Sequence, residues 1–177
     1  MNFIRRCVAA ATLLIASAAC CFASALSIQV VQHSKGESKI FETTRAIENS
    51  LLDFFFENGC IVSNSPIAVS QFDANEDENI FYKGSDDAYY GSIRYFVTVY
   101  VDLDIDDSKN PDAVALSNIS KISWKTVDVR TNEEIDHGSG KVKASAQNAK
   151  KKEDAEKRVV DFASEVAARI FREIKAR

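Results

Sequence analysis

The sequence feature that most constrains the fold is a regular alternation between Ile93 and Ile105. Apolar side chains occupy every second position, and polar residues such as Thr98 and Asp102 lie between them. A repeat of two residues is that of an extended strand, whose successive side chains lie on opposite faces of a sheet. We therefore expect one face of this strand to meet a hydrophobic layer and much of the other to reach water, as in an antiparallel sheet covered on one side. The apolar positions are Ile93, Tyr95, Val97, Val99, Val101, Leu103 and Ile105.

Two segments with helical spacing can form that hydrophobic layer. Apolar residues recur along one helical face within residues 39–58, and Gly59 then supplies a residue that tolerates the left-handed end of a helix. A second apolar stripe lies within residues 147–175, with basic residues at its end, where the helix dipole favours positive charge. We expect both helices to cover the same sheet. The stripes are Ile40, Ile47, Leu51, Phe54 and Phe55 in the first segment and Ala155, Val159, Phe162, Val166, Ile170 and Ile174 in the second.

Shorter strand patterns complete the predicted sheet. Residues 26–31 and 60–62 flank the first helix, which predicts a βαβ unit with parallel strands and the helix on one face. Residues 114–129 form a long strand pattern whose apolar side changes near Lys125, which indicates a bulge. Residues 135–144 return beside it as the second strand of a hairpin.

The predicted fold class is therefore α+β, with a mixed, mainly antiparallel sheet and two amphipathic helices packed on it. The order of elements along the chain is β-α-β-β-β-β-α, and residues 26–177 form a single domain. Residues 72–91 are predicted to be mostly loop, because acidic and aromatic residues are interleaved there.

The N-terminal residues 1–25 are typical of a secretory signal peptide. Arg5 and Arg6 precede an uncharged, Ala- and Leu-rich run, and Ala23-Ser24-Ala25 supplies the small residues of a cleavage site. The run is shorter than the ~20 apolar residues that span a bilayer. We therefore expect an exported, periplasmic protein whose mature chain starts at Leu26.

Cysteine placement leaves one alternative for the export signal. Cys20 or Cys21 could be the acylated cysteine of a bacterial lipoprotein, but the leucine usual three residues upstream of such a cysteine is absent. Membrane contact is expected only if one of these cysteines carries a lipid. If cleavage follows Ala25, Cys60 is the one cysteine of the mature chain, so no intrachain disulfide is expected, and its apolar surroundings predict a buried thiol.

Charge and motif content exclude several functional classes. The chain has 26 acidic against 22 basic residues, and generic nucleic-acid binding needs a surplus of Lys and Arg to neutralise phosphates. The sequence contains no glycine-rich phosphate loop, no GxSxG elbow, no HExxH and no CxxC. We expect no enzymatic activity, no catalytic residues and no cofactor. His33 and His137 lie in separate strand segments without neighbouring metal ligands, and both are predicted to be surface residues.

A run of aspartates keeps a second function open, that of a small-ligand or divalent-metal binding periplasmic protein. Asp102, Asp104 and Asp106 have the opening spacing of a calcium loop, with Asp112 nearby. The calcium-loop pattern then fails, because Asp107 stands where glycine is needed and Ala113 where a bidentate glutamate is needed. Strand alternation already explains Asp102 and Asp104 as an outward-facing row, so no metal ligand is assigned.

The order of elements resembles a small periplasmic domain found in LpoB-like activators of penicillin-binding proteins and in curli-secretion-type lipoproteins. The matching pieces are the helix-glycine-strand segment 46–62, the segment 88–92 ahead of the long strand, and the hairpin turn 127–135. The resemblance implies an α+β domain without catalytic residues that acts by binding other envelope proteins.

These observations predict a non-enzymatic envelope accessory protein that binds another envelope protein. The expected contact residues are the aromatic side chains of the acidic segment, which either pack on the core or meet a partner. They are Phe72, Phe81, Tyr82, Tyr89 and Tyr90.

Overall fold

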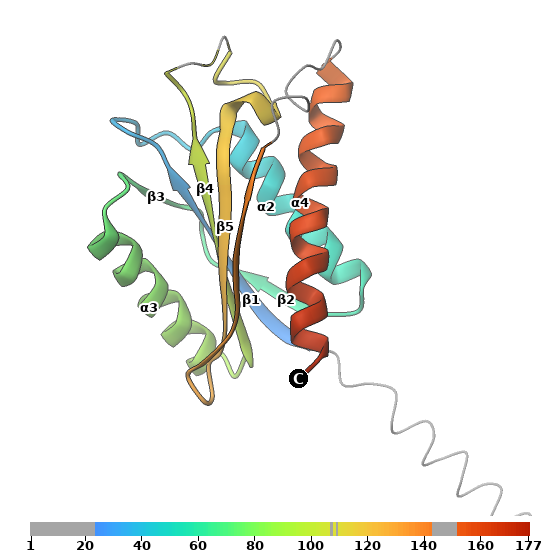
Figure 1. Cartoon of the computed structure of the whole chain (residues 1–177). Coiled ribbons are helices and arrows are strands. Elements are labelled where there is room, and N and C mark those ends of the chain that lie inside the picture. Colours follow the sequence, from blue (N-terminus) through green and yellow to red (C-terminus); the bar gives the residue numbers. More distant parts are fainter. Residues whose placement is uncertain (1–23, 107, 109, 143–151) are drawn as a thin grey trace, which may run out of the picture.

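The computed structural model describes residues 24–106, 108, 110–142 and 152–177 and confirms an α+β fold (Figure 1). Six strands form one mixed sheet with the order β2-β1-β4-β5-β6, and β3 also pairs with β1. The pairs β1–β2, β1–β3 and β1–β4 are parallel, whereas β4–β5 and β5–β6 are antiparallel. The strands are β1 (Ala25–His33), β2 (Ile61–Asn64), β3 (Ala68–Ser70), β4 (Tyr95–Leu103), β5 (Ile119–Asp128) and β6 (Glu133–Lys141).

Helices α2 (Glu42–Glu57) and α4 (Lys152–Lys175) cover one face of the sheet, as predicted. Alternate residues of β4 point toward them, and Phe55 of α2 and Ile170 of α4 are fully buried in the same cluster. The ring centroid of Phe55 lies 6.4 Å from that of Phe171, which joins the two helices. The β4 residues in this core are Tyr95, Val97, Val99, Val101 and Leu103.

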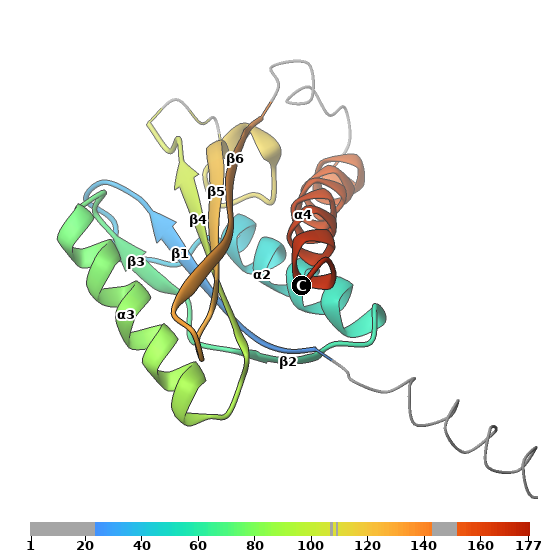
Figure 2. The same cartoon turned by 60° about the horizontal axis from the view of Figure 1, so that its bottom comes forward.

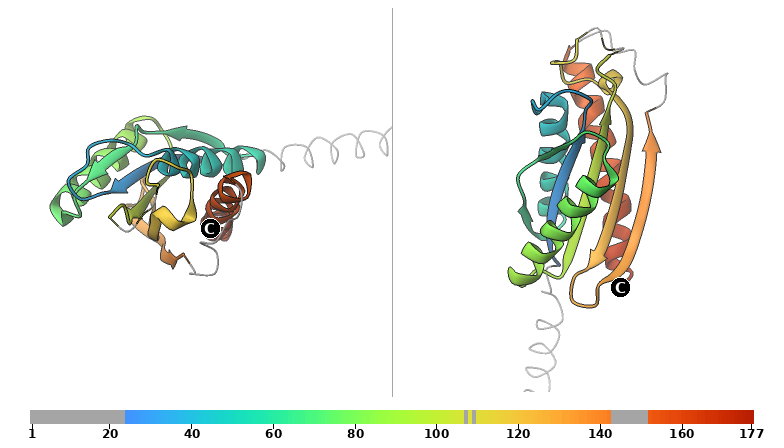
Figure 3. Two further views of the ribbon diagram at one scale, coloured as in Figure 1. Left: turned by 90° about the horizontal axis from the view of Figure 1, so that it is seen from above. Right: turned by 90° about the vertical axis from the view of Figure 1, so that its left-hand side faces the viewer.

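The predicted loop at 72–91 is wrong, because residues Ala74–Tyr90 form a third helix, α3. Figure 2 shows α3 on the opposite side of the sheet from α2 and α4, and Figure 3 gives the same arrangement from two further directions. The side chain of Asp73 caps the helix by accepting hydrogen bonds from the backbone N–H groups of Asn75 and Glu76. The prediction that much of this second face would reach water is therefore also wrong.

Helix α3 packs on the sheet through a narrow contact. Phe81 and Ala88 are buried beside Phe96 of β4, and Gly84 lies between them on the helix. A Cβ atom on Gly84 would lie 2.3 Å from Cζ of Phe96 and 2.5 Å from Oε1 of Gln29. The absence of a side chain at this glycine thus allows the helix backbone to approach the sheet closely.

Several boundaries differ from the sequence prediction. Strand β3 was not predicted, and a short 3-10 helix (Leu116–Asn118) replaces the start of the strand expected from residue 114. The expected bulge is present as a register shift between Thr126 and Val127. Residues 143–151, which include the predicted start of the last helix, and the signal segment 1–23 lie outside the described residues.

Cys60 is buried and free, as predicted, and burial raises the pKa of its thiol. None of the helices in the described ranges combines the length and hydropathy needed to cross a bilayer.

Candidate functional site

The candidate site lies where the carboxyl ends of β1 and β4 meet the start of α3. Two cavities open here. The first, about 350 Å³ and called the tyrosine pocket below, is lined by residues that include His33, Asp77, Tyr82, Tyr100 and Lys125. In open α/β sheets, the carboxyl ends of parallel strands are a usual place for ligands and partners.

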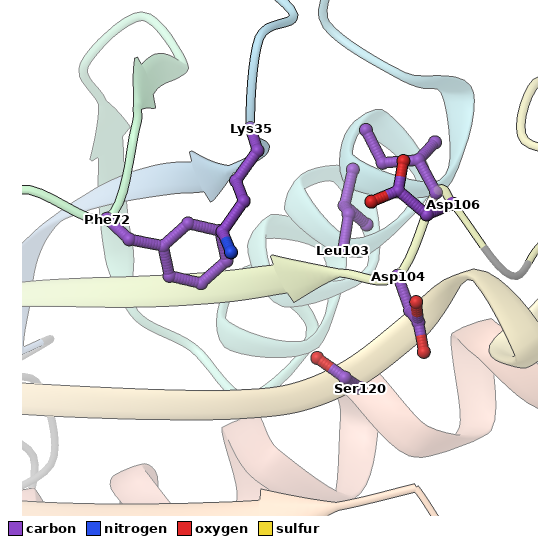
Figure 4. A pocket seen from close by; sticks show the side chains of 7 residues that line it. Lys35, Phe72, Leu103, Asp104, Asp106 and Ser120 are labelled. Atoms are coloured by element: carbon purple, nitrogen blue, oxygen red, sulfur yellow. The ribbon is translucent and has the colours of Figure 1, made fainter.

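The second cavity, about 530 Å³ and called the aspartate pocket below, is lined by Phe72, Asp104 and Asp106 among others. In Figure 4, Lys35 and Phe72 lie on one side of this pocket, with Asp104 and Asp106 on the other. Phe72 has a φ of 62°. This left-handed conformation is uncommon for a residue other than glycine.

His33 lines the tyrosine pocket and joins three elements. Parallel pairing of β1 with β4 places His33 opposite Asp102, and its Nδ1 lies 2.7 Å from Oδ1 of that aspartate. Its Nε2 lies 3.1 Å from Oδ1 of Asp77 in the first turns of α3. The rings of Phe72 and Tyr100 lie 4.8 and 5.3 Å from the imidazole centroid.

The prediction that His33 is a surface residue is therefore wrong, since only 8% of it is exposed. Burial lowers its pKa, but the hydrogen bonds and charges of Asp102 and Asp77 act the other way and leave the pKa above its ordinary value. His137, in contrast, is exposed in β6, as predicted, and its Nδ1 lies 2.7 Å from Oε1 of Glu134.

The aspartates of the calcium-like run do not converge. Asp102 is engaged by His33, Asp104 and Asp106 line the aspartate pocket, and Asp112 forms an ion pair with Lys39. Within the described part of the chain, no group of three or more His, Cys, Asp or Glu residues is placed to hold a metal ion. Asp102 is therefore a hydrogen-bond partner of His33.

The aromatic residues proposed as partner contacts separate into two groups. Phe81 is 7% exposed and packs against Phe96 of the core, so it cannot be an exposed contact and leaves the proposed set. Phe72, Tyr82, Tyr89 and Tyr90 remain on the surface, with exposed fractions of 43, 54, 56 and 83%.

The segment that carries these exposed aromatics is strongly acidic. Residues 73–90 contain six acidic side chains and one lysine, Lys83. Acidic side chains lie at both ends of α3, close in the sequence to Tyr82, Tyr89 and Tyr90. The acidic residues are Asp73, Glu76, Asp77, Glu78, Asp86 and Asp87.

Sequence reasoning missed several residues of the tyrosine pocket, among them Asp77, Tyr100 and Lys125. Asp77 was treated as part of a solvated loop, Tyr100 lies on the face of β4 that was expected to meet water, and Lys125 was considered only as the position of a bulge. An apolar residue on the polar face of a strand was the available signal: Phe96 and Tyr100 both interrupt that face of β4. Such residues indicate a second packed layer.

A family model described as "Uncharacterised protein" matches residues 25–175. The chain belongs to this family. No curated protein matches the chain.

Several solved structures are similar to this chain, and three of them follow. A PelC dodecamer from Paraburkholderia phytofirmans has 8% identity and a TM-score of 0.43, covering 88% of this chain and 89% of that chain. The LpoB C-terminal domain from Salmonella enterica has 12% identity and a TM-score of 0.37, and the match covers 70% of this chain and 86% of that chain. Lipoprotein GNA1162 from Neisseria meningitidis has 12% identity and a TM-score of 0.40, and the match covers 86% of this chain and 99% of that chain. The LpoB domain is thus among the similar structures, and likeness at this level assigns no function to the chain.

Proposed function

We propose that the chain is an exported, non-enzymatic accessory protein that binds another envelope protein through α3. The contact region, called the α3 surface below, consists of Phe72, Tyr82, Tyr89 and Tyr90 with the acidic residues around them. The observation that carries this proposal is the row of exposed aromatic side chains on a helix that is itself packed on the sheet. Aromatic residues are enriched in protein interfaces because they bury a large area at small entropic cost.

Charge indicates the chemistry of the partner. Six acidic residues with a single lysine in this segment create a negative potential around the tyrosines. A segment rich in Lys or Arg complements that potential, and its cations can also stack on tyrosine faces. The proposed partner therefore presents a basic segment to the α3 surface.

The structure of the tyrosine pocket favours a binding role over catalysis. Both ring nitrogens of His33 lie within hydrogen-bond distance of carboxylates, at 2.7 and 3.1 Å. An imidazole engaged on both sides has no free nitrogen to accept a proton from a substrate. In this arrangement His33 connects β1 with β4 and α3.

The N-terminal sequence supports export. The predicted signal peptide ends at Ala25, where both β1 and the family match begin. Cleavage there leaves a periplasmic protein, whereas lipidation at Cys20 or Cys21 would hold the same domain at a membrane. Intact-mass analysis of the protein isolated from cells distinguishes a chain starting at Leu26 from an acylated one.

Replacing Tyr82 and Tyr89 together by Ser is expected to abolish co-purification of the partner while leaving the fold intact. Loss of two interface aromatics at ~2 kcal/mol each, ~4 kcal/mol together, weakens binding by roughly a thousandfold. Both residues are more than half exposed, so the expected change in unfolding free energy is within about 1 kcal/mol. Quantitative mass spectrometry of affinity-purified samples, alongside thermal unfolding, measures both effects.

The matched control replaces Val160 by Ser on the other side of the molecule, where this α4 residue is 42% exposed. This variant is expected to retain the partner. Equal capture by the tyrosine variant and the wild type would rule out the α3 surface as the contact.

A further inference from the structure

We propose that His33 is a proton-dependent latch, which holds the first turns of α3 on the sheet when it is doubly protonated and releases them when it is neutral. The latch would regulate the α3 surface, so its biological role rests on the proposed function. The latch itself is a property of the isolated chain.

The hydrogen bonds of His33 determine its protonation state. Ionised carboxylates only accept hydrogen bonds, and His33 has one on each ring nitrogen, from Asp102 and Asp77. A neutral imidazole carries one N–H group and can satisfy only one of them. The two distances therefore favour the imidazolium ion over the neutral imidazole.

The other groups around the imidazole do not replace this proton. Tyr100 of β4 faces the ring, and burial together with the charge of Asp77 raises its pKa to about 12, so its hydroxyl stays neutral at physiological pH. Glu78 of α3 lines the same pocket and adds negative charge. The ammonium group of Lys125 of β5 lies 4.3 Å from the Phe81 ring centroid and 3.5 Å from Glu134. Negative groups therefore predominate close to His33, and they agree with its raised pKa.

The contact with Asp77 matters because the start of α3 has little other attachment to the sheet. The buried residues of the helix are Phe81, Gly84 and Ala88, all beyond its first two turns. Residues 74–80 contribute no buried side chain, and the nearby hydrogen bond from the Gln71 N–H to Glu76 reaches only the preceding loop. The hydrogen bond from His33 to Asp77 is thus the polar link between these turns and β1.

Deprotonation acts on the Asp77 side of the latch. A neutral His33 keeps its shorter hydrogen bond, 2.7 Å to Asp102, and then presents the lone pair of Nε2 to a carboxylate oxygen of Asp77. That pair repels. The latch is fully formed below the ordinary histidine pKa of about 6.5 and is lost as the pH rises through the raised pKa of His33. Because Asp77 and Tyr82 line one pocket and Phe72 lies against His33, release would disturb the α3 surface.

Hydrogen–deuterium exchange of the purified mature chain between pH 6 and 9 tests the latch without any partner. After correction for the intrinsic pH dependence of exchange, protection of residues 74–80 is expected to fall with rising pH. The expected loss is about tenfold for each unit by which the pKa of His33 exceeds its ordinary value. Protection of the later part of α3 should change little.

Two substitutions make the test specific. In Asp77→Asn the carboxamide can donate to a neutral Nε2 or accept from a protonated one, so protection of residues 74–80 should become independent of pH. In Asp87→Asn the same charge is removed from α3 away from His33, and the pH dependence should persist. An NMR titration of the His33 ring, assigned with the His137→Gln variant, should give a pKa above 6.5.

Protection that is constant with pH in the wild type, or an unchanged pH dependence in Asp77→Asn, would overturn the latch. Neither result involves a partner, so neither bears on the proposed function. Conversely, failure to capture a partner at any pH would refute the proposed function and leave the exchange data as the test of the latch.

Discussion

The Phe55→Ala variant is expected to lose about 3–5 kcal/mol of unfolding free energy. Phe55 belongs to α2, and its side chain is fully buried. Its ring packs edge-on against the rings of Phe54 and Phe171, at centroid distances of 5.7 and 6.4 Å. Truncation leaves a cavity between α2 and α4 that the sheet beneath cannot fill, because the surrounding side chains are held by both helices. Chemical denaturation monitored by the fluorescence of Trp124, the single tryptophan, measures the loss.

The adjacent Phe56 provides the control. It is 76% exposed, so Phe56→Ala is expected to change the unfolding free energy by no more than about 0.5 kcal/mol. Similar losses for the two variants would contradict the packing of α2 on α4 described above.

The second large effect is expected for the Phe81→Ala variant, which should lose about 3 kcal/mol of unfolding free energy. Phe81 is 7% exposed, and its centroid lies 5.7 Å from that of Phe96. Together with Ala88 and Gly84 it holds α3 against the sheet. For a chain of this size the loss corresponds to a fall of roughly 10 °C in Tm, which calorimetry measures directly.

Tyr82→Ala serves as the neighbouring control, because the Tyr82 side chain is 54% exposed. This variant is expected to unfold within about 2 °C of the wild type and still lose its partner. If Phe81→Ala were as stable as Tyr82→Ala, α3 would not be packed on the second face of the sheet.

Strong periodicity explains which parts of the fold could be predicted from the sequence. The alternation through β4 and the apolar stripes of α2 and α4 correctly indicated a sheet with both helices on one face. Helix α3 was missed because its buried side is made of Phe81, Gly84 and Ala88. Two of these three residues are too small to register as an apolar stripe, and the acidic residues around them resemble a solvated loop.

The candidate site was harder to predict because it depends on strand order and register. His33 and Asp102 are 69 positions apart in the sequence and meet only because β1 pairs directly with β4 in one particular register. No local pattern specifies that register. Exposure of Tyr82, Tyr89 and Tyr90 and burial of Phe81 likewise follow from the rotation of α3 on the sheet, which the sequence pattern left undefined.

Site-specific photo-crosslinking in living cells tests the central claim that the α3 surface contacts an envelope protein. A photoreactive amino acid at Tyr82 is expected to give one dominant adduct, whose crosslinked peptide comes from a Lys- or Arg-rich segment of an exported protein. The same group at Val160 on α4 should not give that adduct. Absence of an adduct from Tyr82, or an identical adduct from both positions, would contradict the account.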